Sequence, residues 1–327
     1  MSSESPLQRH VLNGATMGTR YSAVFFAPAG IDLGAIGAAL LAAVDRVDRQ
    51  MSTWKSDSDL SRLNAAPLWQ WHRVPPELWT VLDAALRVGR ESGGAFDIGV
   101  GDAVNAWGFG PTGDAPDAQH IRALGQRPRR AAHEVLELDP AQQRLRKHSA
   151  VVLDLSGIAK GYGVDALAAC LDGLGIARYL VGIDGEMRAK GSKPGGQAWA
   201  VAIEKPVRHV REAMGVMELA DAAIATSGDY RHYFELAGQH YAHTMHPATG
   251  RPVDNRLASV TVVMPSCMLA DAWATALLVM GAPAATALAQ QQGMTALLVL
   301  REVGGLDAGD DGEAFTQISI VDGVLQP

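Results

Sequence analysis

From residue 179 to residue 263 the sequence places one predicted strand after another, with no helical pattern between them. Parallel strands need a crossover of about a dozen residues, usually a helix, whereas antiparallel strands can follow one another directly. The order of elements therefore predicts an α+β fold of mixed, largely antiparallel sheets with packed helices, and it disfavours a doubly wound parallel sheet. These strands are expected at 179–183, 198–203, 216–219, 233–236 and 259–263.

The N-terminal third predicts one strand and two amphipathic helices. The strand is expected at 20–26, after a short polar lead. Asp32 is expected to cap a helix, because apolar residues follow it at spacings of three and four. A Pro-Pro pair at 75–76 opens a second predicted helix and a Gly-Gly pair at 93–94 closes it. The apolar face of the first helix consists of Leu33, Ile36, Leu40, Val44, Val47 and Met51.

Polar segments separate these elements. Residues 51–64 are rich in turn and cap residues and are expected to form a surface loop that ends in a helical turn. Residues 110–133 are rich in Pro, Asp, Gly and Arg and are expected to be a loop or a peripheral helical insert. The remaining predicted elements are a strand at 151–155, a helix at 160–174, helices that begin after Ser266 and at Pro283, and strands at 296–300 and 318–321.

The length of 327 residues would suit two ordinary domains or one large one. Because the loop-rich segment at 110–133 is no clean boundary, we expect a single catalytic domain over residues 1–327, with a subdomain or insert around 100–150.

The net charge of -7 and the absence of a long Lys/Arg run argue against nucleic acid as a partner. An anionic substrate would therefore need a few local cations or a metal ion.

The compartment and the cysteine chemistry are also constrained. The first ten residues contain no apolar core typical of a signal peptide, and no apolar run of 18 residues follows. The sequence predicts a chain without a transmembrane segment that is cytoplasmic as written, or periplasmic if a leader has been removed. Cys170 and Cys267 lie in apolar stretches, so neither a disulfide framework nor a CxxC site is indicated.

The sequence at 268–279 places Asp271 and Thr275 four residues apart in an otherwise apolar predicted helix. Their oxygens would lie on one helical face, a single turn from each other. An ionised carboxylate in such surroundings is costly unless it meets a cation or several donors, and Mg²⁺ prefers oxygen ligands of this kind. The alternative is local capping by Asp271 and a bond from Thr275 to the carbonyl one turn earlier.

Two further segments carry candidate chemistry. At 151–163 a predicted strand turns into a helix through Gly157, and Lys160 there could meet a phosphate, although an ordinary Gly-rich turn explains the pattern equally well.

His243 and His246 precede a Pro-x-Thr-Gly turn. Pro247 prevents a helix through the pair, and no third zinc ligand is evident, so one histidine as a general base is the better functional interpretation, against a merely solvated side chain.

In order along the chain, these segments resemble the ApbE family of FAD:protein FMN transferases from about residue 13 to residue 300. The resemblance rests on seven ordered motifs. They are TMGT at 16–19, MSTW at 51–54, FDI at 96–98 leading to WGFG at 107–110, DLSGIAKGY at 154–162, SGDY at 227–230, HxxxPxTG at 243–250 and ADAWAT at 270–275.

The resemblance implies a flavin cleft in an ApbE-like α+β fold. It implies that Asp271 and Thr275 hold Mg²⁺ together with a main-chain oxygen near Gly157, and that His243 is the catalytic base. The FAD-binding residues implied in the same way are Met17, Trp54, Ala95, Phe96, Asp97, Asp154, Lys160 and Met245.

The activity implied is transfer of FMN from FAD, through a phosphoester, to a Thr or Ser of a target flavoprotein, with release of AMP. The alternatives are an FAD pyrophosphatase that releases FMN and AMP, and a non-catalytic flavin-binding protein. The chain departs from the family pattern at His246, where Asp or Asn is usual, and at Trp54, which replaces a common Tyr and keeps its stacking surface without the hydroxyl.

Overall fold

The computed structural model describes residues 6–111, 115–126, 128–209, 211–231, 233–236, 239–302 and 314–326. Within these ranges, nine strands form one sheet in which every neighbouring pair is antiparallel. The sheet confirms the predicted α+β class. Its strands, in spatial order, are β1 (Leu7–Thr16), β2 (Thr19–Pro28), β6 (Tyr179–Ile183), β7 (Glu186–Lys190), β10 (Ala223–Gly228), β15 (Leu257–Met264), β16 (Thr295–Arg301), β17 (Phe315–Val321) and β18 (Val324–Leu325).

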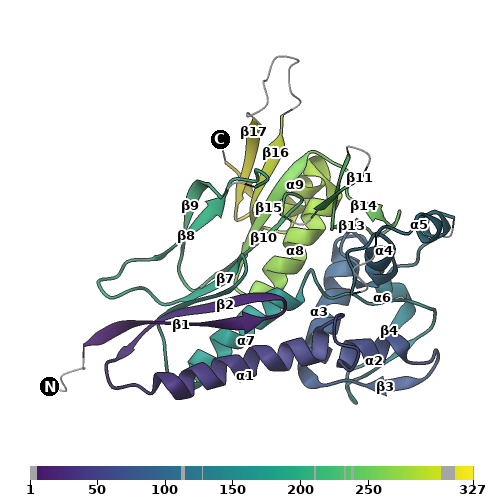
Figure 1. Ribbon diagram of the computed structural model, residues 1–327. Helices are drawn as coiled ribbons and strands as arrows, with labels where there is room; N and C mark the ends of the chain where they lie inside the picture. Colours follow the sequence, from purple (N-terminus) through teal and green to yellow (C-terminus); the bar gives the residue numbers. More distant parts are fainter. Residues whose placement is uncertain are drawn as a thin grey trace.

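One face of this sheet is covered by three helices, α1 (Leu33–Met51), α7 (Ala159–Gly173) and α8 (Cys267–Met280). Helix α1 packs on α7, α7 packs on α8, and α8 packs on β10 and β15, as Figure 1 shows. Helix α8 is buried on nearly all sides, which its almost uninterrupted apolar sequence allows. Two more helices, α3 (Pro76–Glu91) and α9 (Ala282–Gln291), pack against α8.

The opposite face is partly covered by a two-stranded ribbon, β8 (Trp199–Glu204) and β9 (Ala213–Leu219). Alternate residues of β8 face the sheet, and Trp199, Val201 and Ile203 form an apolar cluster with Ile224 of β10. The ribbon therefore lies on the sheet through side chains, without joining its hydrogen-bond ladder.

Short elements complete the described structure. They are α2 (Asp59–Ala65), the strands β3 (Trp71–Arg73), β4 (Leu136–Asp139) and β5 (Arg144–Lys147), the 3₁₀ turn η1 (Ile98–Val100), α4 (Gly101–Ala106), α5 (Ala118–Leu124), α6 (Ala132–Val135), and the hairpins β11 (Tyr233–Leu236) with β12 (Gln239–Ala242) and β13 (Met245–His246) with β14 (Arg251–Pro252). Among the described residues, no helix has the length and apolarity needed to cross a membrane.

The predicted helix starts are confirmed by their caps. The Asp32 side chain accepts the Ala35 N–H at the start of α1, and the Ser266 side chain accepts the Leu269 N–H at the start of α8. Helix α2 ends the polar loop as expected. The predicted insert at 110–133 contains α5 and α6, although residues 112–114 and 127 lie outside the described ranges. The single-domain organisation stays a prediction.

The strand predicted at 151–155 is wrong, because the hydrogen bonds of this segment go elsewhere. Val152 accepts the N–H of Gly101, and Asp154 donates to Ile98 in the 3₁₀ turn. The side chain of Asn64 bonds to both the N–H and the C=O of Leu153, at 2.8 and 2.9 Å. An extended apolar segment thus meets a side chain and a turn where a second strand would otherwise lie.

The polar lead before residue 20 is also more regular than predicted, because β1 occupies ten residues there and pairs with β2 along its whole length. As an edge strand with one exposed side, β1 needs few apolar residues, so its polar composition did not indicate a strand.

The contact of α7 with α8 depends on a glycine. A Cβ added to Gly161 would meet the carbonyl oxygen of Cys267 and lie 2.8 Å from Cβ of Asp271. Because the first of these neighbours is backbone, rotation of a side chain cannot relieve the clash. Gly161 therefore sets how closely the two helices approach.

We predict that Gly161→Ala lowers the free energy of unfolding by about 1–3 kcal/mol, measured by urea denaturation. Gly173→Ala, on the same helix but with nothing within 4 Å of the added Cβ, is the matched control. It should be neutral or stabilising by up to about 1 kcal/mol. Equal effects of the two substitutions would contradict the close contact.

Candidate active site

A cavity of about 830 Å³ opens between the helix layer, the ends of the central strands, and the loops that carry the sequence motifs. All twelve residues predicted for the site line it. They come from segments far apart in the sequence, which only the fold brings together. These residues are Met17, Trp54, Ala95, Phe96, Asp97, Asp154, Gly157, Lys160, His243, Met245, Asp271 and Thr275.

Asp271 and Thr275 lie one turn apart on α8, at the wall of the cavity. Asp271 is 4% exposed and accepts the N–H of Gly161 at 3.0 Å. The hydroxyl of Thr275 lies 2.9 Å from that of Ser227, at the end of β10. Gly157, in the turn before α7, sits so close that a Cβ there would come within 3.1 Å of the Thr275 hydroxyl oxygen. The three predicted oxygen donors thus belong to one corner of the cavity.

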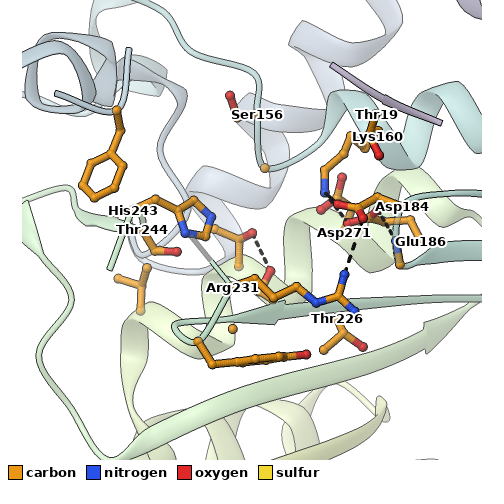
Figure 2. A pocket seen from close by; sticks show the side chains of 18 of the residues that line it. Thr19, Ser156, Lys160, Asp184, Glu186, Thr226, Arg231, His243, Thr244 and Asp271 are labelled. Carbon is orange, nitrogen blue, oxygen red and sulfur yellow. Dashed lines mark hydrogen bonds and ion pairs between the residues drawn. The ribbon is translucent and has the colours of Figure 1, made fainter. Parts of the chain in front are cut away.

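Lys160 lies beside this corner, in a group of carboxylates. Its ammonium is 2.9 Å from Oε1 of Glu186 and 3.5 Å from Oδ2 of Asp184 (Figure 2). Burial by itself would lower the pKa of Lys160, but Glu186, Asp271 and Asp184 together raise it. Lys160 is therefore a fixed positive charge at the cavity wall.

Asp271 is a buried carboxylate of this group, and its ionised form is costly. Burial, reinforced by the nearby Glu186 carboxylate, raises its pKa to about 7, while Lys160 and the N–H of Gly161 act in the opposite direction. A cation placed beside Asp271 would favour the ionised carboxylate. The chemistry of this corner therefore suits a divalent ion with oxygen ligands.

A second cation lies farther out in the cavity. Arg231 is 3.4 Å from Asp184 and also pairs with Glu204 of β8, whose carboxylate accepts the Tyr230 hydroxyl at 3.3 Å. Figure 2 shows Arg231 between the Lys160 group and His243. These ion pairs connect the turn between β6 and β7, the β8 ribbon and the segment after β10.

Sequence reasoning missed Asp184, Glu186, Glu204 and Arg231, although all four line the cavity. A signal existed for the first two. They flank Gly185 directly after a predicted strand, and an Asp-Gly pair is typical of a tight turn between antiparallel strands. The structure has that turn, with a positive φ of 56° at Asp184. Glu204 and Arg231 carried no signal, because only the placement of the ribbon against the sheet brings them together.

Two other predicted residues hold the backbone around the cavity. The carboxylate of Asp97 accepts the N–H groups of Gly99 and Ala132, at 2.8 and 3.0 Å. Burial raises the pKa of Asp97, while these two bonds oppose the shift. Asp154 accepts the N–H of Ser156 at 2.7 Å and so shapes the turn that presents Gly157.

His243 lies across the cavity from Asp271 and Lys160, in the connection between β12 and β13 (Figure 2). Its ring meets the edge of Phe109, with 6.3 Å between ring centroids. Trp54 is 65% exposed at the cavity rim, as its polar loop suggested. His246, by contrast, is not a lining residue, and its Nδ1 is buried with no hydrogen-bond partner among the described residues.

Within the described residues, no group of three or more His, Cys, Asp or Glu side chains is arranged to hold a metal ion. The ligand set expected at this site does not need such a group. It combines one carboxylate, one hydroxyl and one main-chain oxygen, and such a set leaves the other positions of an octahedral ion to water and substrate.

Known proteins resemble this chain over nearly its whole length. The ApbE family matches residues 17–298. A protein named FAD:protein FMN transferase from Vibrio cholerae serotype O1 is 40% identical over 303 residues, which cover 91% of this chain and 89% of that protein. A protein of the same name from Escherichia coli (strain K12) is 34% identical over 298 residues, 89% of this chain and 84% of that one.

Solved structures agree. The flavin transferase ApbE from Vibrio cholerae superposes with a TM-score of 0.82 at 35% identity, over 96% of this chain and 97% of that chain. The apo form of the flavinyl transferase ApbE from Pseudomonas stutzeri gives a TM-score of 0.83 at 35% identity, over 99% and 97% of the two chains. With seven motifs gathered at one cavity and this likeness in sequence and structure, the chain belongs to the ApbE family.

Proposed function

We propose that this chain is a Mg²⁺-dependent enzyme that transfers FMN from FAD to a Thr or Ser hydroxyl of an acceptor protein and releases AMP. The observation that carries the proposal is the position of Asp271 and Thr275 one turn apart beside Gly157, with His243 across the same cavity from Asp271 (Figure 2). The names of the relatives, FAD:protein FMN transferase, support the same reaction.

The charge of the cavity supports the need for a metal ion. Among the described lining residues are six carboxylates but only three Lys or Arg side chains, and Lys160 and Arg231 are already paired with carboxylates. A diphosphate would be repelled by this surface unless a cation came with it. When bound, Mg²⁺ would supply Lewis-acid stabilisation of charge on the phosphate oxygens.

The residues present fit such an ion. Asp271 offers a carboxylate that burial makes costly to ionise alone, and Thr275 offers a hydroxyl one turn away. Gly157 has no side chain, and a Cβ at this position would press on Thr275. We propose that Asp271, Thr275 and the main-chain oxygen near Gly157 hold the ion.

The cavity also suits FAD in size and surface. A volume of about 830 Å³ lies in the range of cofactor sites, roughly 300–1,000 Å³. Met17, Trp54, Phe96 and Met245 give it apolar and aromatic surface for a flavin ring. We propose that these residues and Ala95 contact the flavin and that Lys160 provides charge toward the phosphates. We propose that Asp97 and Asp154 also belong to the FAD site, where their carboxylates hold the surrounding loops in place.

His243 is the proposed general base. Its imidazole would take the proton from the acceptor hydroxyl as that oxygen bonds to the phosphorus on the FMN side of FAD. The bond from this phosphorus to the bridging oxygen breaks, and AMP leaves with that oxygen. The new bond is a phosphoester, and water in place of the hydroxyl would give free FMN.

The reaction is tested by incubating the protein with FAD, Mg²⁺ and an acceptor flavoprotein, followed by mass spectrometry of the acceptor. We expect covalent FMN on one Thr or Ser, and a fall in rate of about 100-fold or more in His243→Ala, because a positioned base typically contributes 10²–10⁴-fold. His120→Ala, an exposed histidine on α5 outside the cavity, is the control and should leave the rate unchanged. AMP and free FMN without an adduct would identify a pyrophosphatase instead.

We predict that Asp271→Ala lowers Mg²⁺-dependent transfer by about 100-fold or more, since loss of one electrostatic partner of the reacting group commonly costs that much. The fold should survive, because the substitution removes a buried charge that burial disfavours. Transfer rates and thermal unfolding midpoints check the two expectations. Asp83→Ala, an exposed carboxylate on α3, is the matched control, and full activity of Asp271→Ala would refute the metal assignment.

A further inference from the structure

Helix α8 carries both proposed metal-binding side chains, yet its first turn is held by a residue of another helix. The carboxylate of Asp165, on α7, accepts the N–H groups of Cys267 and Met268, each at 3.0 Å. It also accepts the hydroxyl of Ser266, the ordinary cap of α8, at 2.7 Å. The free N–H groups at a helix start favour a negative charge, so Asp165 acts as a second cap supplied from outside the helix.

Asp165 lies one turn after Gly161 on the same face of α7. Gly161 touches the carbonyl of Cys267 and donates its N–H to Asp271, while Asp165 binds the N–H groups of the same first turn of α8. The two contacts act on opposite groups of this turn, a carbonyl and the N–H donors. Together they fix both how far α8 slides along α7 and how it is rotated.

A third element is tied to the same carboxylate. Arg188 of β7 donates to Asp165 at 2.6 Å. Two residues earlier on that strand, Glu186 pairs with Lys160 of α7 at 2.9 Å. Since residues two apart on a strand share a face, β7 meets α7 through two ion pairs, one in the cavity wall and one at Asp165.

We propose that Asp165 is a positioning residue for the site, and this inference rests on the proposed function. Asp165 contacts no reacting group and is not among the residues that line the cavity. Its carboxylate sets the position of α8 and therefore the point at which Asp271 and Thr275 present their oxygens, one and two turns beyond Cys267. Because a metal ion tolerates little error in ligand position, a small shift of α8 should weaken the site while leaving the core intact.

The experiment compares Asp165→Asn and Asp165→Glu with Ser266→Ala. The Asn substitution keeps the shape and removes the charge, and the Glu substitution keeps the charge and moves it by one methylene. Ser266→Ala removes the local cap of α8 and one hydroxyl bond to Asp165, but it leaves the Asp165 carboxylate on the Cys267 and Met268 N–H groups. It is therefore the matched control for a general loosening of the helix start.

The first readout is the Mg²⁺ concentration that gives half-maximal FMN transfer, measured at a temperature where each variant is folded. We expect it to rise about tenfold or more in Asp165→Asn and Asp165→Glu, and by less than about twofold in Ser266→Ala, even where the thermal midpoints fall equally. A wild-type Mg²⁺ requirement in a folded Asp165 variant would overturn the proposal, as would an equal rise in Ser266→Ala. If Asp165→Asn does not fold, Asp165→Glu decides.

The second readout needs no activity. Cys267 is fully buried in the first turn of α8 and Cys170 is half-buried on α7, so thiol labelling in a Cys170→Ser background reports whether that turn stays packed. We expect faster labelling of Cys267 in Asp165→Asn than in Ser266→Ala, and equal rates would count against the proposal. If the wild-type protein transfers no FMN, the proposed function fails, while the labelling rates still show whether Asp165 holds α8.

Discussion

The close contact of α7 with the first turn of α8 is the constraint on which the rest of the site depends. Gly161 allows the two backbones to touch, and its N–H reaches the carboxylate of Asp271. From this contact, α7 presents Lys160 and the preceding Gly157 turn, and α8 presents Asp271 and Thr275. A wider separation would move two sets of groups apart at once, because each helix is rigid over its length.

Electrostatics explains why this arrangement would suit the proposed ion and the proposed anionic substrate together. Among its described lining residues the cavity has more carboxylates than Lys and Arg side chains, and burial raises the pKa of Asp271. Such a surface is unfavourable for a phosphate alone and favourable for a divalent cation that a diphosphate can share. The ion pairs of Lys160 and Arg231 hold the surrounding carboxylates in place, so the cavity wall is charged but ordered.

Local sequence signals predicted the elements well where the signal was itself local. The caps at Asp32 and Ser266 are formed by hydrogen bonds within three residues, so composition and spacing reveal them. The predictions that failed concern segments whose structure depends on contacts with distant parts of the chain. The segment 151–155 has strand composition, but Asn64 and the 3₁₀ turn take its hydrogen bonds, and the polar edge strand β1 is recognisable only from its pairing with β2.

By itself the sequence determined the α+β class, the starts of α1 and α8 and, through the family resemblance of its ordered motifs, twelve of the residues that line the cavity. Only the tertiary structure decided which groups surround them. Glu186 beside Lys160, Glu204 beside Arg231, and Asp165 at the start of α8 are pairs separated by 26 residues or more, and no pattern along the chain connects them. The reason is physical: hydrogen bonds and ion pairs act over a few ångströms of space, so contacts between distant segments exist only once packing has fixed where each backbone lies.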